Sequence, residues 1–294
     1  MEKRNAKNFR CDSAFDAIRE RKNRLSQGRN FATDRRGARR RSMKPHSIIA
    51  VVDRAGQGGG GAAPWTPLTM FAASEIGGYY DPSNIATLWQ DAAGTTSVVA
   101  DGDPVGKMAD LSGNGNHWTS SGTARPTYHA SGGKYWLQFD GIDDQMTLAS
   151  RVDLYDLTVG AAFSIATGGG GTVRGLMGWT VGSTSSYFCN VAAGLTLPRF
   201  LGYTGGVVAS AATALSTTSV LTVRRINSTG VGTCRQNGVQ KAAFTTYTGF
   251  SIIDALYRMG ANCADGKLYG LVMCGASVSD AQQLELETYL TGKI

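Results

Sequence analysis

Charged residues are scarce in this sequence, at 17% of 294 residues, against about 25% in an average globular chain. Long apolar runs are also absent. The longest strongly apolar stretch, Ile48 to Val52, is far shorter than the roughly 18 residues of a membrane span. The segment before residue 25 is crowded with charge and lacks the apolar core of a secretion signal. We therefore expect a protein that neither spans a membrane nor is secreted.

Cysteine is sparse and its spacing is uninformative. The five cysteines are odd in number and show no Cys-x-x-Cys motif, so neither a disulfide framework nor a zinc site is indicated. We expect four of them to be buried thiols: Cys189, Cys234, Cys263 and Cys274. Cys11 stands in a charged N-terminal segment, where a free thiol is favoured over a bond to another subunit.

Glycine, in contrast, is abundant. The sequence holds 39 glycines, nearly twice the usual share of about 7%. Many tight turns combined with few charged helical faces indicate an all-β protein.

The positive charge is concentrated at the N-terminus. Residues 1–45 carry a net charge of +10, whereas the remaining residues carry −3. We predict a basic arm over 1–45, a short strand with a Gly/Pro-rich linker over 46–75, and a β domain over 76–294. Glycines in the linker formally match a dinucleotide-binding motif, but Pro64 and Pro67 exclude the helix that such a site requires.

The basic arm has three interpretations. A short helix is predicted over residues 12–25, with Phe15 and Ile18 on one apolar stripe. An arginine-rich stretch follows, containing Arg35, Arg36, Arg39, Arg40 and Arg41. Because apolar residues recur among the charges and no nucleic-acid-binding module follows, we favour docking on another protein over binding of nucleic acid. A solvated tail is the third alternative.

The strongest local signal is a predicted hairpin over residues 134–148. Leu137 and Phe139 alternate with Trp136 and Gln138, as on a half-buried strand. An Asp-Gly dipeptide follows. It favours a turn, because glycine adopts positive φ and aspartate hydrogen-bonds the local backbone.

Two further signals follow along the chain. Asn237-Gly238 between extended stretches predicts a type I′ hairpin. Ser279 and Gln282 form a capping box that opens a short helix ending near Leu290. Other strands are predicted at 158–166, 175–180, 186–192, 199–203 and 220–226. The turn residues between them favour a two-sheet antiparallel sandwich over alternating β and α units.

The order of these signals resembles a known family. The Phe-Asp-Gly-x-Asp-Asp hairpin at 139–144, the Asn-Gly hairpin and the Ser-Asp-Ala helix start at 279–281 are similar to the laminin G-like branch of the concanavalin A-like lectin/glucanase superfamily. The resemblance covers residues 76–294 and implies a jelly-roll sandwich with a short C-terminal helix. That sandwich hosts lectins, glucanases and plain adhesion modules.

A narrower resemblance involves Trp-Thr-Pro-Leu at 65–68, Tyr-Tyr-Asp-Pro-Ser at 79–83 and Asp-x-Ser-Gly-Asn-Gly-Asn-His at 110–117. These segments are similar to modules of tailed-bacteriophage structural proteins. The resemblance implies a virion protein, serving as a decoration, fibre or tail/neck component. It would be anchored to other virion proteins through residues 1–60, form a homo-oligomer or symmetric array, and attach to surface glycans. The alternatives are a host-encoded carbohydrate-binding or adhesion module and a polysaccharide hydrolase.

Hydrolysis is opposed by the carboxylate inventory. A retaining glucanase needs two carboxylates about 5 Å apart, commonly from Glu-x-Asp-x-Glu on one strand. After residue 45 the only glutamates are Glu75, Glu285 and Glu287. No Gly-x-Ser-x-Gly elbow appears, and His117 and His129 fall in predicted loops. We therefore expect no enzyme and assign no catalytic residue.

One loop resembles a calcium site in part. Asp110, Ser112 and Asn114 have the opening spacing of an EF-hand loop, but Ser121 stands where a bidentate glutamate is needed. We favour a polar loop held by its own hydrogen bonds, with Ca²⁺ binding by Asp110 and Asn114 as the alternative. The aspartates of the 140–144 turn could also supply ligands, although turn formation accounts for them.

Sugar binding needs an exposed aromatic face beside hydrogen-bonding groups. The candidates are Trp118, Trp179, Tyr187 and Tyr203. A core position is favoured for each of them over a sugar-stacking one, and the sequence does not show which aromatic side chains face water.

Overall fold

The structure is a computed structural model that describes residues 64–150, 152–165, 174–181, 184–191, 199–201, 207–210, 218–245, 258–259 and 265–294. Side chains are described for 64–150, 152–164, 218–245 and 265–294. The chain divides into Met1–Gly60 and Gly61–Ile294, and the described residues all belong to the second unit. The basic arm, with its predicted helix, Phe15, Ile18 and arginines, therefore lies outside the described residues. No described helix is long and apolar enough to cross a membrane.

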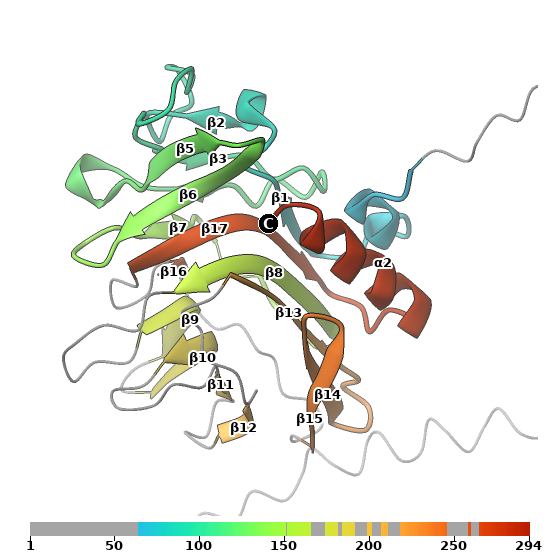
Figure 1. The fold of residues 1–294 in the computed structure, drawn as a ribbon. Helices are drawn as coiled ribbons and strands as arrows, with labels where there is room; N and C mark the ends of the chain where they lie inside the picture. The colour runs from blue at the N-terminus through green and yellow to red at the C-terminus, as the bar shows by residue number, and fades with distance from the viewer. Residues whose placement is uncertain are drawn as a thin grey trace, which may run out of the picture. The chain divides into compact units, whose positions relative to one another are not determined.

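The described strands form two antiparallel sheets (Figure 1). The eight-stranded sheet runs β15-β14-β13-β8-β17-β6-β5, and β1 pairs with β17. Its strands are β1 (Gly77–Tyr80), β5 (Thr127–Ser131), β6 (Lys134–Asp140), β8 (Leu157–Ile165), β13 (Ser219–Arg225), β14 (Val231–Gln236), β15 (Val239–Thr245) and β17 (Asp265–Cys274).

The nine-stranded sheet runs β12-β11-β10-β9-β16-β7-β4-β3-β2. Its strands are β2 (Leu88–Trp89), β3 (Lys107–Met108), β4 (Trp118–Thr119), β7 (Met146–Leu148), β9 (Arg174–Val181), β10 (Thr184–Val191), β11 (Arg199–Leu201), β12 (Val207–Ser210) and β16 (Arg258–Met259). The described helices are η1 (Pro67–Phe71), η2 (Ile85–Thr87), η3 (Gly122–Ala124) and α2 (Asp280–Thr291). The predicted two-sheet antiparallel sandwich with a short C-terminal helix is confirmed.

The main core fills the space between the two sheets. In β6 the predicted alternation holds, because Leu137 and Phe139 are buried in this core while Trp136 and Gln138 alternate with them on the opposite face. Trp118 of β4 is fully buried and meets Tyr80 of β1 edge to face, with ring centroids 5.9 Å apart. This aromatic contact joins one sheet to the other.

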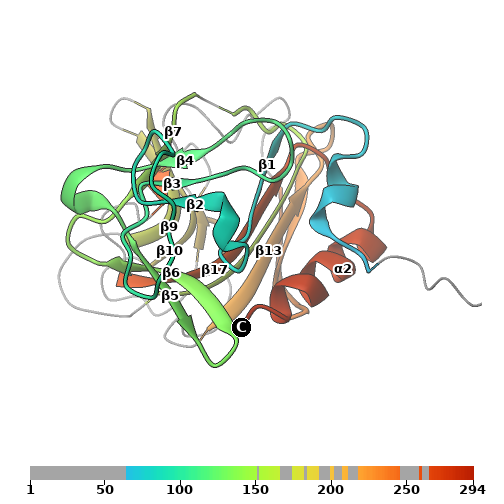
Figure 2. The ribbon, with the colours of Figure 1, turned by 90° about the horizontal axis from the view of Figure 1, so that it is seen from above.

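A second core covers the outer face of the eight-stranded sheet. Figure 2 shows η1 and α2 on the side of β13 and β17 that faces away from the nine-stranded sheet. Met70 and Phe71 of η1 and Leu286 and Leu290 of α2 are buried here. The sequence assigns η1 to the linker, whereas in the structure η1 packs on the sandwich. Its two large apolar side chains, Met70 and Phe71, are buried against β17 and α2.

The turn and cap chemistry follows the sequence. Asn237 and Gly238 both have positive φ, 49° and 77°, as a type I′ turn requires. Gly141 has φ of 75° in the turn after β6. Ser279 and Gln282 form the predicted capping box at the start of α2.

Polar groups fasten α2 and the C-terminal residues to the sheet. Glu287 is 3% exposed and accepts hydrogen bonds from the Thr222 hydroxyl and from Nε and Nη2 of Arg235. Farther along, Oδ2 of Asp81 accepts from the Lys293 ammonium at 2.6 Å and from the Tyr289 hydroxyl at 2.7 Å. Burial by itself would raise the pKa of Asp81, but these donors outweigh it and hold the pKa below its ordinary value.

Two predicted buried thiols are confirmed. Cys234 and Cys274 are free and buried, and burial raises the pKa of each to about 12, so neither is a reactive thiolate at neutral pH. Cys189 lies in β10, whose side chains lie outside the description, and Cys11 and Cys263 lie outside the described residues.

Candidate functional site

The outer face of the nine-stranded sheet presents a row of polar and aromatic side chains. Strand pairing places Trp89 beside Lys107, Lys107 beside Thr119, and Thr119 beside Thr147, across β2, β3, β4 and β7. All four side chains are half-buried, whereas the alternating residues such as Met108 are buried in the core. The two-residue periodicity of strands therefore directs these four toward the outer face.

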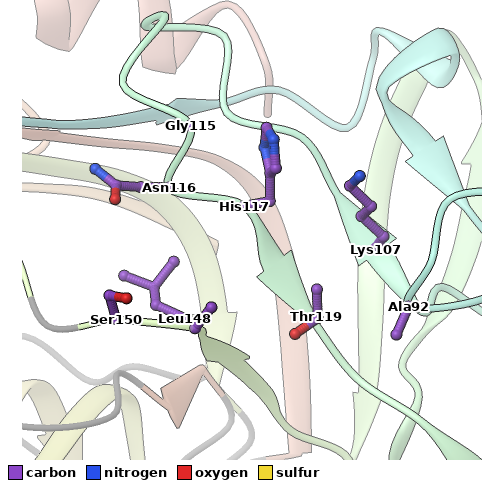
Figure 3. Close-up of a pocket in the computed structure, with 9 residues that line it drawn as sticks. Ala92, Lys107, Gly115, Asn116, His117, Thr119, Leu148 and Ser150 are labelled. Atoms are coloured by element: carbon purple, nitrogen blue, oxygen red, sulfur yellow. The ribbon is translucent and has the colours of Figure 1, made fainter.

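A hollow of about 230 Å³ lies at this row. Its polar lining comes from Lys107, Asn116, His117, Thr119 and Ser150, and Leu148 and three small residues complete the wall (Figure 3). Pockets that enclose a drug-sized ligand measure about 300–1,000 Å³. The hollow is therefore large enough for one small polar ring but not for an enclosed oligomer.

A hydrogen bond within the loop before β4 determines which ring nitrogen of His117 can donate. The backbone N–H of Asp110 donates to Nδ1 of His117 over 3.0 Å. The neutral imidazole therefore carries its proton on Nε2 and can donate from that atom. The sequence predicts a loop position for His117, and the structure adds that its ring lines the hollow.

The same loop is held by Asp110, which is 9% exposed. Its carboxylate accepts from the backbone N–H groups of Tyr79, Ser112 and Asn116 and from the Ser112 hydroxyl. The Asn114 amide donates to the backbone carbonyls of Glu75, before β1, and Gly77, the first residue of β1. These hydrogen bonds agree with the predicted polar loop, and Ca²⁺ binding by Asp110 and Asn114 stays a prediction.

Lys107 has no carboxylate partner in the part of the chain that the structure describes. Its ammonium lies 5.1 Å from the centroid of the Trp89 ring, within the range of a cation–π contact. The neighbouring carboxylate of Asp91 accepts from the backbone N–H groups of Thr95 and Thr96, and these bonds hold its pKa below the ordinary value. The Asp91 carboxylate therefore stabilises the turn formed by residues 91–96.

Three carboxylates meet in the turn after β6. Ligand oxygens of Asp140, Asp143 and Asp144 lie within 4.8 Å of one another, close to the spacing of a retaining glycosidase pair and suitable for a hard cation. Oδ1 of Asp140 accepts from the backbone N–H groups of the three residues that close the turn. Asp144 is 4% exposed and accepts from the Asp140 N–H. Turn formation therefore accounts for Asp140 and Asp144, as the sequence predicts, whereas the Asp143 carboxylate accepts from the Thr123 hydroxyl outside the turn.

Asp144 gives a pH-dependent prediction. Burial, with the nearby charges of Asp140 and Asp143, raises its pKa to about 7, while the unfolded value is about 3.9. Between these values the folded chain binds more protons than the unfolded chain, so this group lowers the free energy of unfolding as pH rises from 4 to 7. Asp144→Asn should therefore gain roughly 1–2 kcal/mol of stability relative to wild type at pH 8 and little at pH 4.5. Thermal melts in EDTA at both pH values measure this, and an equal difference at both would contradict it.

The predicted sugar-stacking residues have different outcomes. The expectation that Trp118 offers a face to a sugar is wrong, because its side chain is fully buried between the sheets. Trp179 and Tyr187 lie in β9 and β10, whose side chains lie outside the description. Tyr203 lies outside the described residues.

His129 corrects a local expectation. It lies in the middle of β5 and not in a loop, because its backbone pairs with Trp136 of β6. Nδ1 of His129 is 3.0 Å from Oδ1 of Asp101. The ring stacks on Trp136 with centroids 5.5 Å apart. This arrangement ties the β5 edge to the loop between β2 and β3, which contains Asp101.

Sequence reasoning missed Trp89, Lys107 and Thr119. The alternation of His117 and Thr119 around the buried Trp118 was the available signal for one wall of the hollow. No signal pointed to Lys107, because β3 is only two residues long and a single pair of residues shows no periodicity.

No protein-family model and no curated protein sequence matches the chain. Among solved structures, a Trypanosoma rangeli sialidase matches with a TM-score of 0.48 and 11% identity, over 82% of this chain and 35% of that chain. The binding domain of Paraclostridial Mosquitocidal Protein 1 has a TM-score of 0.48 and 11% identity, over 65% and 51%. A botulinum neurotoxin serotype D ligand-binding domain in complex with N-acetylneuraminic acid has a TM-score of 0.49 and 8% identity, over 78% and 53%. The chain thus spans between about a third and a half of these solved chains, and similarity this limited supports no inference about its ligand or activity.

Proposed function

We propose that the sandwich is a glycan-binding module without enzymatic activity, and that the hollow beside Trp89 and Lys107 is its sugar site. The observation that carries the proposal is the difference between the two outer faces. The outer face of β1, β8, β13 and β17 in the eight-stranded sheet is covered by η1 and α2, whereas the nine-stranded sheet presents the row and the hollow.

The chemistry of the hollow suits a sugar. Sugar rings offer hydroxyl groups that both donate and accept hydrogen bonds, and Nε2–H of His117 can donate to them. The Thr119 hydroxyl donates to the Thr147 carbonyl at 3.3 Å, so its oxygen remains an acceptor. Trp89 does not itself line the hollow, but its half-buried indole contacts the ammonium group of Lys107, which does, and so positions that group.

The setting that we propose is a bacteriophage virion. In that setting residues 1–60, which include the basic arm, bind other virion proteins. The sandwich faces the host surface, and the protein forms a homo-oligomer or symmetric array. Support comes from the charge of +10 on residues 1–45 and from the resemblance of the 79–83 and 110–117 segments to phage structural modules. Pull-down of residues 1–60 with virion proteins or DNA tests the arm. Capture of DNA alone would contradict protein docking.

The sugar site is tested on an array of bacterial surface polysaccharides with the full chain. Trp89→Ala should weaken binding of each hit at least tenfold, equivalent to about 1.4 kcal/mol. Tyr155→Ala is the matched control, because Tyr155 is 47% exposed and precedes β8 of the other sheet. Calorimetric titration measures both variants. Equal affinities for wild type and Trp89→Ala would contradict this location of the site.

A hydrolase is the second candidate. Carboxylate oxygens of Asp140, Asp143 and Asp144 lie within 4.8 Å of one another, which is close to the separation of the two carboxyl groups in a retaining glycosidase. Release of reducing sugar by the full chain that disappears in Asp143→Asn would favour it. Glycan binding without such release supports the binding module.

A further inference from the structure

We propose that the hollow selects an acidic sugar, whose carboxylate or sulfate is held between the Lys107 ammonium and Nε2–H of His117. This inference rests on the proposed glycan-binding function and specifies the class of ligand. It follows from the distribution of charge and of hydrogen-bond donors around the hollow.

The lining of the hollow has one cation and no acidic residue. Lys107 contributes the positive charge, and the other lining side chains are neutral polar or apolar groups, with His117 taken as neutral. Asp91 and Asp110, which adjoin lining residues in the sequence, accept hydrogen bonds from the backbone N–H groups of their own loops. Neither carboxylate forms an ion pair with Lys107 among the described residues.

Lys107 is positioned without being neutralised. Its contact with the Trp89 ring orients the ammonium group and leaves it without a carboxylate partner among the described residues. A bound anion could therefore form charge-assisted hydrogen bonds with it, which are roughly twice as strong as hydrogen bonds between neutral groups.

His117 adds a second donor beside the cation. Figure 3 shows the side chains of Lys107 and His117 projecting toward the same side of the hollow, one from β3 and the other from the loop before β4. Because Nδ1 of His117 already accepts the Asp110 N–H, the outward donor is Nε2–H. A carboxylate or sulfate oxygen accepts from both groups, whereas a sugar hydroxyl would leave the ammonium charge uncompensated.

The wall opposite Lys107 and His117 provides neutral groups that could contact the rest of the sugar ring. Asn116 and Ser150 lie there in Figure 3. The Asn116 amide donates to the Gly77 carbonyl at 2.6 Å, which fixes this wall to β1. The volume of about 230 Å³ fits one sugar residue, so the acidic residue would be a chain terminus or a side branch.

Discrimination then comes from the charge. A neutral sugar in the hollow would partly desolvate Lys107 and offer it no counter-charge, which disfavours that ligand. An acidic sugar gains the ion pair and is also attracted at a distance, in a manner that salt screens. Selectivity and salt dependence are therefore the two measurable signatures.

The experiment uses the full chain on an array of carboxylated, sulfated and neutral glycans. Each carboxylated hit is then titrated beside its methyl ester, which has the same sugar skeleton without the charge. We expect acidic glycans to bind at least tenfold more tightly than their neutral counterparts, and this preference to shrink between 50 and 300 mM NaCl. The carboxylated and sulfated arms identify which anion is held.

Variants separate the charge of Lys107 from its bulk. Lys107→Met should remove the preference for acidic glycans and leave the melting temperature close to wild type, while Lys107→Arg should keep the preference. Lys241→Met is the matched control, an exposed lysine on β15 of the other sheet, and should change nothing. Neutral glycans bound as tightly as acidic ones, or an unchanged preference in Lys107→Met, would overturn this inference and leave the glycan-binding function standing. An array without any bound glycan would overturn both.

Discussion

Replacing Trp118 with alanine is expected to lower the free energy of unfolding by about 4 kcal/mol, the range for a fully buried tryptophan. Trp118 is fully buried, and its ring meets Tyr80 of the opposite sheet edge to face. Its loss would leave a cavity where the two sheets face each other. In a domain of this size the change corresponds to roughly 10 °C in melting temperature. Urea unfolding and thermal melts measure it.

Two variants control this prediction. Trp118→Phe retains a ring and should cost roughly half as much as Trp118→Ala. Trp89→Ala removes a half-buried tryptophan from the outer face of the same sheet and should cost under about 1.5 kcal/mol while weakening glycan binding. Equal destabilisation by Trp118→Ala and Trp89→Ala would show that Trp118 is not a core residue.

Glu287→Ala should be the second most damaging substitution, with a loss of about 3 kcal/mol. Removal of Glu287 would leave the half-buried Arg235 guanidinium and the buried Thr222 hydroxyl without the carboxylate that they share. Here the Glu287 carboxylate is 3% exposed and accepts from Arg235 and from the fully buried Thr222. The substitution would therefore loosen α2 from β13 and β14. Hydrogen exchange of α2 amides should rise together with the loss of global stability.

Glu285→Ala is the matched control for this substitution. Glu285 is exposed on the same helix. Both variants replace a glutamate of α2 with alanine, so they remove the same charge and change the helix propensity by the same amount. We expect a change within about 0.5 kcal/mol for Glu285→Ala, as for most surface substitutions. If both variants melted at the same temperature, the network around Glu287 would contribute nothing to stability.

Much of the fold was predictable because its signals are local. The alternation in β6, the positive φ of Gly141 and the capping box at Ser279 each depend on a few consecutive residues. Such signals act through backbone sterics and local hydrogen bonds, which operate before distant segments meet. The Asn-Gly hairpin at 237–238 was predictable for the same reason.

The candidate site was far less predictable. Trp89, Lys107 and Thr119 are separated by 18 and 12 positions along the sequence and lie in strands of only two residues. Such short strands carry no periodicity, and the face to which a side chain points is fixed only when strands pair. Trp118 shows the consequence, since the sequence left open whether it stacked on a sugar or filled the core.

The sequence alone determined that this chain has a basic N-terminal segment, a glycine-rich β region with definable turns, and a capped C-terminal helix. Only the tertiary structure decided that η1 and α2 cover one sheet, that Trp118 lies inside, and that Lys107 and His117 line one hollow. The physical reason is that turns and caps are set by neighbouring residues. Burial and the outward direction of a side chain, in contrast, depend on hydrogen bonding and packing between segments far apart in the chain.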